Sequence, residues 1–198
     1  MASAIDRLEH VHPEDRAAWR AWLAANHATA AGAWLVSWKA VTGRPRIPYA
    51  DTVEEALCVG WVDSRAGTID EERSRQLFTP RRAGSGWSRP NKERIERLTA
   101  GGLLLPAGVA VVEAAQADGS WFALDDVENL VEPPELADAL DADPPARGHW
   151  DGFPRSAKRA ILEWISTAKR PDTKSKRIAQ TARLAAENVR ANEWRPKG

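Results

Sequence analysis

Apolar residues recur at helical spacing in several stretches of the chain. Ala18, Trp19, Trp22 and Leu23 form one such stripe, which predicts a helix from about residue 13 to 27. Similar patterns predict helices over 52–59, 89–100, 106–117, 133–140 and 153–168, and a last helix that starts at 171. The last two are expected to form a helical hairpin, and 144–154 is interpreted as a linker with aromatic anchors.

The expected helix ends carry recognisable signals. Asp51, with Glu54 three residues later, resembles a capping box for the helix over 52–59, and Gly60 is placed to end it. Ser88 is placed to cap the helix over 89–100.

Alternating apolar and polar residues predict three strands, over 33–39, 61–69 and 74–79. The turn between the second and third is too short for a crossover, so the strands are expected to be antiparallel. Few strands followed by many helices indicate an α+β fold, with a small antiparallel sheet packed with helices and then a C-terminal helical hairpin. We expect residues 1–132 to form an α+β domain with a ligand pocket. Residues 133–198 are expected to pack on it as a helical region, in one compact unit.

The charges balance over the whole chain but not along it. The 198 residues carry 28 basic and 28 acidic side chains, which argues against a general nucleic-acid binder, so nucleic acid is not an expected partner. Residues 102–145 hold ten acidic and no basic side chains, whereas 155–198 hold twelve basic and four acidic ones. One hypothesis is therefore an interaction module in which the basic hairpin docks an acidic partner or a second copy, as a homo-oligomer.

The single cysteine, Cys58, excludes a disulfide framework within the chain and is expected to be a buried, inert thiol. No apolar stretch approaches the roughly 18 residues that a membrane span needs, and the first residues lack the apolar core of a signal peptide. A cytoplasmic globular protein is the expectation, with no membrane partner. The histidines lack metal-ligand spacing, so no metal and no cofactor is predicted.

One candidate site lies in the run from Cys58 to Arg65. A strand would place Trp61, Asp63 and Arg65 on one face, where the acid could hold a cationic or hydrogen-bonding ligand or act as a general base. The structural alternative is a buried Asp63 that pairs with Arg65 or caps a neighbouring turn. Lys39 is of interest only if it converges with Asp63.

A second candidate site spans residues 79–92, with a glycine-containing loop, a helix start and several cations. Helix N-termini bind anions, although the spacing of a P-loop is absent, and a capped helix behind a surface loop is the structural alternative. The proposed ligand-binding residues in and around the two sites are Trp38, Trp61, Ser64, Thr79, Arg81, Trp87, Ser88, Asn91 and Lys92.

Three sequence segments are VEEALCVGWVDSR, FTPRRAGSGWSRPNKERIERL and FPRSAKRAILEWISTAKRPDTKSKRIAQTARLAAEN. They resemble the bacterial YdeI/OmpD-associated family, which is also labelled bacteriocin-protection. The resemblance extends over nearly the whole chain. It implies a small cytoplasmic α+β protein associated with stress or bacteriocin protection, but supplies no catalytic residues. Val62 and Pro90 depart from the family pattern.

These observations favour a small-molecule-binding protein whose ligand is partly aromatic or apolar and bears an anionic or amide group. Ten tryptophans are present, and Trp38, Trp61 and Trp87 are expected to line its pocket. The alternative is an enzyme in which Asp63 is the general acid or base and Lys39 or Arg81 stabilises negative charge. That mechanism requires Lys39 and Asp63 in one cleft.

Overall fold

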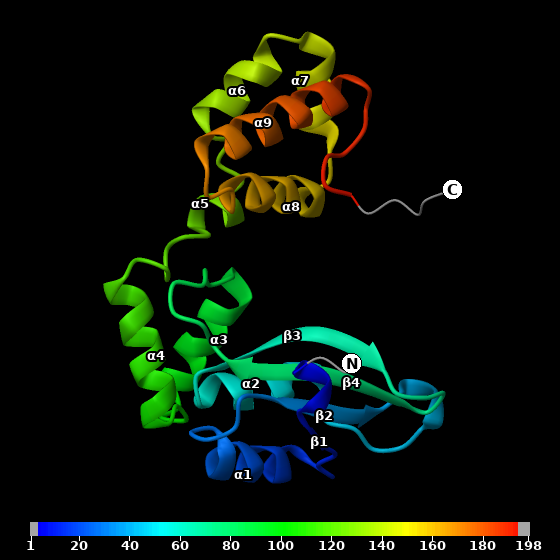
Figure 1. Ribbon diagram of the computed structural model, residues 1–198, viewed down its shortest axis with the longest axis vertical. Coiled ribbons are helices and arrows are strands. Elements are labelled where there is room, and N and C mark those ends of the chain that lie inside the picture. The colour runs from blue at the N-terminus through cyan, green and yellow to red at the C-terminus, as the bar shows by residue number, and fades with distance from the viewer. Residues whose placement is uncertain (1–3, 194–198) are drawn as a thin grey trace. The chain divides into compact units, whose positions relative to one another are not determined.

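The computed structural model describes residues 4–193 and divides the chain into two compact units, Met1–Phe122 and Ala123–Gly198 (Figure 1). The boundary lies before the one at residue 132 expected from sequence. The intervening segment belongs to the second unit because Val127, in the short helix α5 (Asp125–Glu128), is buried in that unit's core. Packing of both parts into one compact unit stays a prediction.

The N-terminal unit contains a four-stranded sheet in the order β1-β2-β4-β3. The predicted strands are β2 (Ala33–Trp38), β3 (Trp61–Thr68) and β4 (Arg73–Pro80), and β4 pairs antiparallel with both others, as expected. The sequence analysis missed β1 (Glu9–Val11), which is parallel to β2, so the sheet is mixed. Three residues are too few for an alternating pattern to stand out.

The helices of this unit begin where the sequence allows. In α1 (Arg16–Asn26), the Asp15 carboxylate accepts a hydrogen bond from the Ala18 backbone N–H at 2.8 Å and caps the helix. The helices α3 (Arg89–Ala100) and α4 (Pro106–Ala117) have the predicted bounds. Ser88 occupies the N-cap position of α3 without making a side-chain capping bond.

The capping box predicted for the second helix is wrong. The helix α2 (Tyr49–Cys58) starts earlier, after Pro48, and Asp51 lies in its first turn. The Asp51 carboxylate instead forms an ion pair with Arg16 of α1 at 2.9 Å. Gly60 ends the segment in a left-handed conformation with φ of +75°, as a glycine after a helix can.

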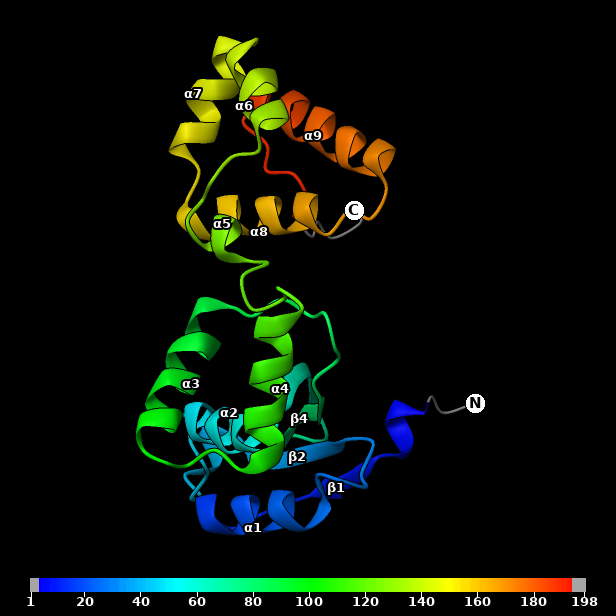
Figure 2. The ribbon, with the colours of Figure 1, turned by 90° about the vertical axis from the view of Figure 1, so that its left-hand side faces the viewer.

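The core of the N-terminal unit lies between one face of the sheet and the helices α1, α2 and α3. It includes the side chains of Trp19, Leu23, Leu35, Leu57, Trp61, Phe78, Trp87, Ile95 and Leu98. Two short 3-10 turns, Ile5–Arg7 and Ala40–Thr42, complete the unit. The helices α3 and α4 lie side by side in both views (Figure 2). No described helix is long and apolar enough to cross a bilayer.

The C-terminal unit is helical throughout, with α6 (Pro134–Asp141), α7 (Pro144–Gly152), α8 (Arg155–Ser166) and α9 (Pro171–Ala186) besides α5. The linker predicted over 144–154 is wrong, because most of it is α7. Proline is tolerated in a first helical turn, and Ala146 and Trp150, four residues apart, are both fully buried. The helices α8 and α9 form the expected hairpin, and α9 also packs against α6 and α7.

Two glycines bring helix α4 against the backbone of its neighbours. A Cβ atom at Gly108 would lie 2.4 Å from the carbonyl oxygen of Cys58, and one at Gly60 would lie 2.7 Å from a methyl group of Val111. The Leu105 N–H also donates to the Cys58 carbonyl at 2.9 Å. Backbone contact this close is open only to glycine.

Candidate functional site

Arg81 lies directly after β4 and stacks on Trp87. Its backbone N–H donates to the Gly60 carbonyl at 3.0 Å, which fixes the start of the loop. The guanidinium carbon lies 3.7 Å from the centroid of the Trp87 ring, a close cation–π contact, and Nη2 donates to the Gly86 carbonyl.

Several nitrogen atoms of this stack are buried without a hydrogen-bond partner among the described residues. They are Nε and Nη1 of Arg81 and Nε1 of Trp87, which is 1% exposed. Burial lowers the pKa of Arg81 to about 10, while the negative charge of Asp63 acts in the opposite direction. The guanidinium is therefore charged at neutral pH, and its desolvation is not offset by a hydrogen-bonded anion.

A small pocket of about 100 Å³ borders the stack. Its lining is the loop residues Arg81, Arg82, Ala83, Gly84, Ser85 and Trp87 together with Val111, Ala114, Ala115, Asp118 and Ser120. The Asp118 carboxylate is already engaged: Ser120 and the Gly84 N–H hydrogen-bond to it and lower its pKa. This carboxylate ties the loop to the end of α4, and Arg81 and Arg82 are the cations at the pocket.

A second polar cluster lies on the core side of the sheet, and the Asp63 carboxylate accepts its hydrogen bonds. Its Oδ2 accepts from the Tyr49 hydroxyl at 2.6 Å and from the Gln76 amide at 3.5 Å. Burial and then the Asp63 carboxylate raise the pKa of Tyr49 to about 12, against the opposing charge of Arg94. The hydrogen bonds of Asp63 thus go to Tyr49 and Gln76 and not to Arg65, which lies within the β-bulge between Asp63 and Ala66 and is exposed.

The structure brings some of the predicted site residues together. Arg81 and Trp87 are stacked, and Asp63 is near enough to Arg81 to influence its pKa. Asn91, in the first turn of α3, accepts a hydrogen bond from Arg94 at 3.0 Å, and Arg94 in turn acts on Tyr49. These residues come from β3, the loop after β4 and the start of α3.

Other predicted residues lie elsewhere. Trp61 is 1% exposed and belongs to the core, and its indole N–H, unlike that of Trp87, has a hydrogen-bond acceptor, the His27 carbonyl. Thr79 follows the buried Phe78 and so points to the opposite face of the sheet, and Ser64 is exposed. Lys92 lies 5.4 Å from the ring centroids of both Trp121 and Phe122.

Lys39 and Trp38 are at the other end of the sheet. Trp38 pairs with Arg73 on β4 and Asp63 pairs with Phe78, which puts about 17 Å of strand between the two positions. The Lys39 ammonium donates to the Asp70 carbonyl at 2.7 Å. The convergence of Lys39 with Asp63 is therefore wrong, and the enzyme hypothesis loses Lys39, whereas Arg81 is near enough to Asp63 to be influenced by its charge. A role of Asp63 as acid or base stays a prediction.

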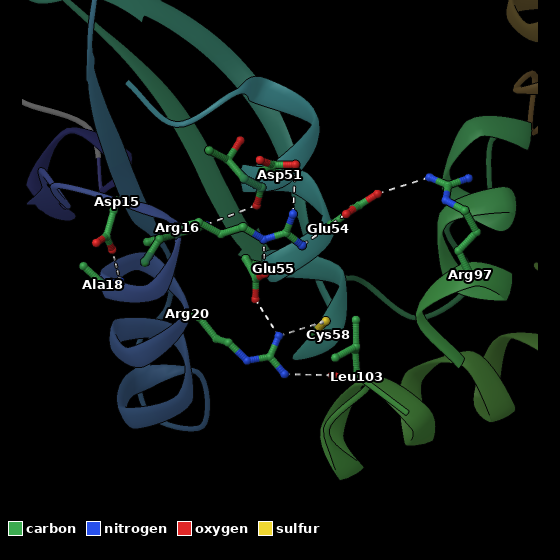
Figure 3. A network of polar contacts seen from close by, with 12 residues as sticks. Asp15, Arg16, Ala18, Arg20, Asp51, Glu54, Glu55, Cys58, Arg97 and Leu103 are labelled. Carbon is green, nitrogen blue, oxygen red and sulfur yellow. Dashed lines mark hydrogen bonds and ion pairs between the residues drawn. The ribbon is translucent and has the colours of Figure 1, made fainter. Parts of the chain in front are cut away.

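The sequence analysis also missed a polar network between α1 and α2 (Figure 3). Glu55, only 3% exposed, accepts from Arg16 at 2.6 Å and from Arg20 at 2.7 Å. Glu54 pairs with Arg16 and with Arg97 of α3, each at 3.1 Å. Each of these carboxylates is shared by two arginines, which is the pattern of a scaffold that joins helices.

Cys58 lies at the edge of this network and is a buried free thiol. Burial and the nearby Glu55 raise its pKa, although Arg20 partly opposes them. A thiol held protonated in this way is a poor nucleophile. Among residues 4–193, no group of three or more His, Cys, Asp or Glu side chains is placed to hold a metal ion.

Comparison with protein-family models assigns each unit separately. Residues 11–111, half of the chain, match a domain of unknown function (DUF8412), and this range contains the Arg81 and Asp63 clusters. Residues 129–188 match the model described as "Bacteriocin-protection, YdeI or OmpD-Associated". No curated protein and no solved structure matches the chain. The chain thus belongs to the DUF8412 family through its N-terminal unit, and residues 129–188 of its C-terminal unit are similar to the YdeI/OmpD-associated, bacteriocin-protection family.

Proposed function

We propose that the N-terminal unit binds a small molecule through an anionic group held by Arg81 and Trp87. The observation that carries this proposal is the set of buried N–H donors without partners on the stacked guanidinium and indole. Buried polar groups in folded proteins are nearly always hydrogen-bonded, so these donors favour a site where a ligand supplies the acceptor oxygens. A carboxylate offers the geometry that a guanidinium recognises best.

The pocket beside the stack supports a ligand with an apolar part. Val111, Ala114 and Ala115 contribute its apolar wall. Its volume of about 100 Å³ is a few times the roughly 30 Å³ that one water molecule occupies in the liquid. A carboxylate joined to a small ring or a short alkyl group fits this space.

Benzoate is a suitable probe, with benzyl alcohol as its uncharged counterpart. We expect benzoate to shift the indole N–H resonance of Trp87 in ¹H–¹⁵N spectra of the full chain, assigned with Trp87→Phe. Benzyl alcohol should leave this resonance in place. Loss of a charged hydrogen-bonding partner costs about 2 kcal/mol, so Arg81→Met should weaken binding about 30-fold.

Arg65→Met is the matched control, since Arg65 is an exposed arginine on the adjacent strand. It should bind benzoate as the parent chain does. The proposal fails if benzoate leaves the Trp87 resonance unchanged at millimolar concentration, or if the two arginine variants lose binding equally.

We further propose that this binding serves the protective role for which the C-terminal family is described, and that it takes place in the cytoplasm. The buried free Cys58 fits a reducing compartment. Deleting the gene should raise bacteriocin sensitivity, and an Arg81→Met allele should restore less resistance than an Arg65→Met allele. Equal resistance from both alleles would show that protection does not depend on ligand binding. Recovery of the protein in a periplasmic fraction would exclude the proposed cytoplasmic location.

A further inference from the structure

A second arginine–tryptophan stack lies on β4, toward the opposite end from Arg81. The Arg75 guanidinium carbon is 4.1 Å from the centroid of the Trp34 ring. Its Nη1 donates to Nε2 of His10 at 3.0 Å, and its Nε is buried without a hydrogen-bond partner. No carboxylate within residues 4–193 forms an ion pair with Arg75, so its charge is not neutralised locally.

The stack borders a groove of about 500 Å³ on the sheet face opposite the core. The groove is lined by His10, His12, Val36, Thr68, Ile69, Arg73 and Arg75. All the ionisable side chains in this lining are histidines and arginines, on β1, directly after it, and on β4. The lining thus combines cationic donors with a short aliphatic floor.

Carboxylates near the groove are already engaged or lie outside it. Asp70 accepts from Nε and Nη2 of Arg73 at 2.8 and 2.6 Å, and Arg73 lowers its pKa. Glu72 forms a long ion pair with Arg44 at 3.8 Å. Glu14 lines the adjoining pocket next to His12. Arg75 is therefore the cation of this groove that has no acidic partner.

We propose that the groove binds a phosphate group, with Arg75 as its principal ligand and His10 as a second donor. Arginine cannot accept a hydrogen bond, so Nε2 of His10 must be the acceptor and Nδ1 of the neutral ring carries its hydrogen. A phosphate has enough acceptor oxygens to engage a guanidinium fork and further N–H groups together. A free phosphate ester and the backbone of a single-stranded nucleic acid both supply this group.

Calorimetric titration of the full chain tests the proposal with three probes: inorganic phosphate, adenosine monophosphate and a single-stranded 12-nucleotide RNA. At least one should bind. His10 is exposed, so His10→Ala should leave the fold intact and weaken binding of that probe severalfold. Arg75→Lys should weaken it about tenfold, because an ammonium replaces the fork. Arg65→Lys is the matched control and should bind as the parent chain does.

The three probes distinguish the two sources of phosphate. Tighter binding of RNA than of adenosine monophosphate identifies the nucleic-acid backbone as the source. Its affinity should then fall with salt concentration as steeply as contacts with several phosphates require. Equal or tighter binding of adenosine monophosphate identifies a free phosphate ester. Arg81→Met should leave either result unchanged, so this site and the benzoate site can fail independently. Absence of binding by all three probes, or binding that neither His10→Ala nor Arg75→Lys weakens, overturns the proposal.

Discussion

Arginines of the two units differ in the partners of their guanidinium groups. In the C-terminal unit, Arg147 bonds to Glu132 and Asp141, and Arg159 bonds to Glu128 and Glu163, all at 2.7–3.1 Å. In the N-terminal unit, Arg75 and Arg81 lie on tryptophan rings and keep buried nitrogens without partners. All the buried unpartnered side-chain nitrogens and oxygens of the described chain belong to the N-terminal unit.

The difference separates arginines that hold a fold together from the two arginines for which we propose ligands. Breaking a buried ion pair is costly because it leaves an uncompensated charge, whereas removing a charge that lacks a partner relieves a desolvation penalty. Arg16 and Arg20, which share Glu55, show that the N-terminal unit also contains arginines of the first kind. Whether a guanidinium has a hydrogen-bonded carboxylate partner therefore says more about the role of the arginine than how deeply it is buried.

The largest effect is expected for Arg147→Met. Glu132 would keep the Trp150 indole N–H, at 2.7 Å, but lose its cation. We expect the free energy of unfolding to fall by about 2 kcal/mol, which moves the urea midpoint by about 1 M at a typical denaturant dependence. Circular dichroism during urea unfolding measures this change. A midpoint within 0.2 M (roughly 0.4 kcal/mol) of the parent would mean that this network is not stabilising.

Arg81→Met makes the same chemical change in the N-terminal unit and should cost much less. The substitution removes a guanidinium with two buried, unpartnered nitrogens and places an apolar side chain on Trp87. The free energy of unfolding should therefore stay within about 1 kcal/mol of the parent, in either direction. The same urea experiment gives the value. A loss as large as that of Arg147→Met would erase the proposed distinction between the two units.

The hydrogen bond from Tyr49 to Asp63 predicts a change in the pKa of Tyr49. This extends the comparison from arginines to an acidic group. Tyr49 is the single tyrosine of the chain, so absorbance at 295 nm reports its ionisation alone, and the midpoint should lie near pH 12. A pKa raised by folding means that the stability contributed by neutral Tyr49 is complete below about pH 10 and is lost as the pH rises through 12. Asp63→Asn should lower the midpoint, and an unchanged midpoint would show that the carboxylate does not act on the phenol.

The smallest effect is expected for Arg183→Ala. Arg183 pairs with Glu187 at 3.2 Å on the surface of the C-terminal unit, with both side chains about 60% exposed. Exposed pairs four residues apart on a helix contribute about 0.3–0.5 kcal/mol. Thermal unfolding should change by a degree or so (about 1–2 °C for a chain of this length). A larger shift would show that pairing matters even where water screens it.

Much of the fold could be predicted because the patterns were long. Helices α3, α4 and α9 begin at or next to the predicted residues, since proline in the first turn marks their starts. Helix α7 was missed because prolines and glycines in residues 144–152 resemble a linker, while its buried Trp150 and Ala146 depend on tertiary packing. Strand β1 was missed because it is only three residues long.

The candidate site was predictable only in part. The segment after β4 identified Arg81 and Trp87 by its mixture of cations, glycine and a helix start. Alternation along a strand shows which residues share a face but not whether that face is buried, so the sequence did not indicate that Trp61 lies in the core. Tyr49 and Gln76 carry no local signal, since their contact with Asp63 joins residues distant in sequence.

The glycine contacts of α4 have a mechanical consequence. Where side chains separate a helix from its support, they can change rotamer and absorb a displacement. Gly108 places α4 on the Cys58 carbonyl, and the adjacent Gly60 carbonyl accepts the backbone N–H of Arg81. A movement of α4 is therefore transmitted through main-chain atoms to the loop that carries Arg81. The wall of the pocket and the guanidinium are thus linked through the backbone of residues 58–60, with no side chain between them to absorb a shift.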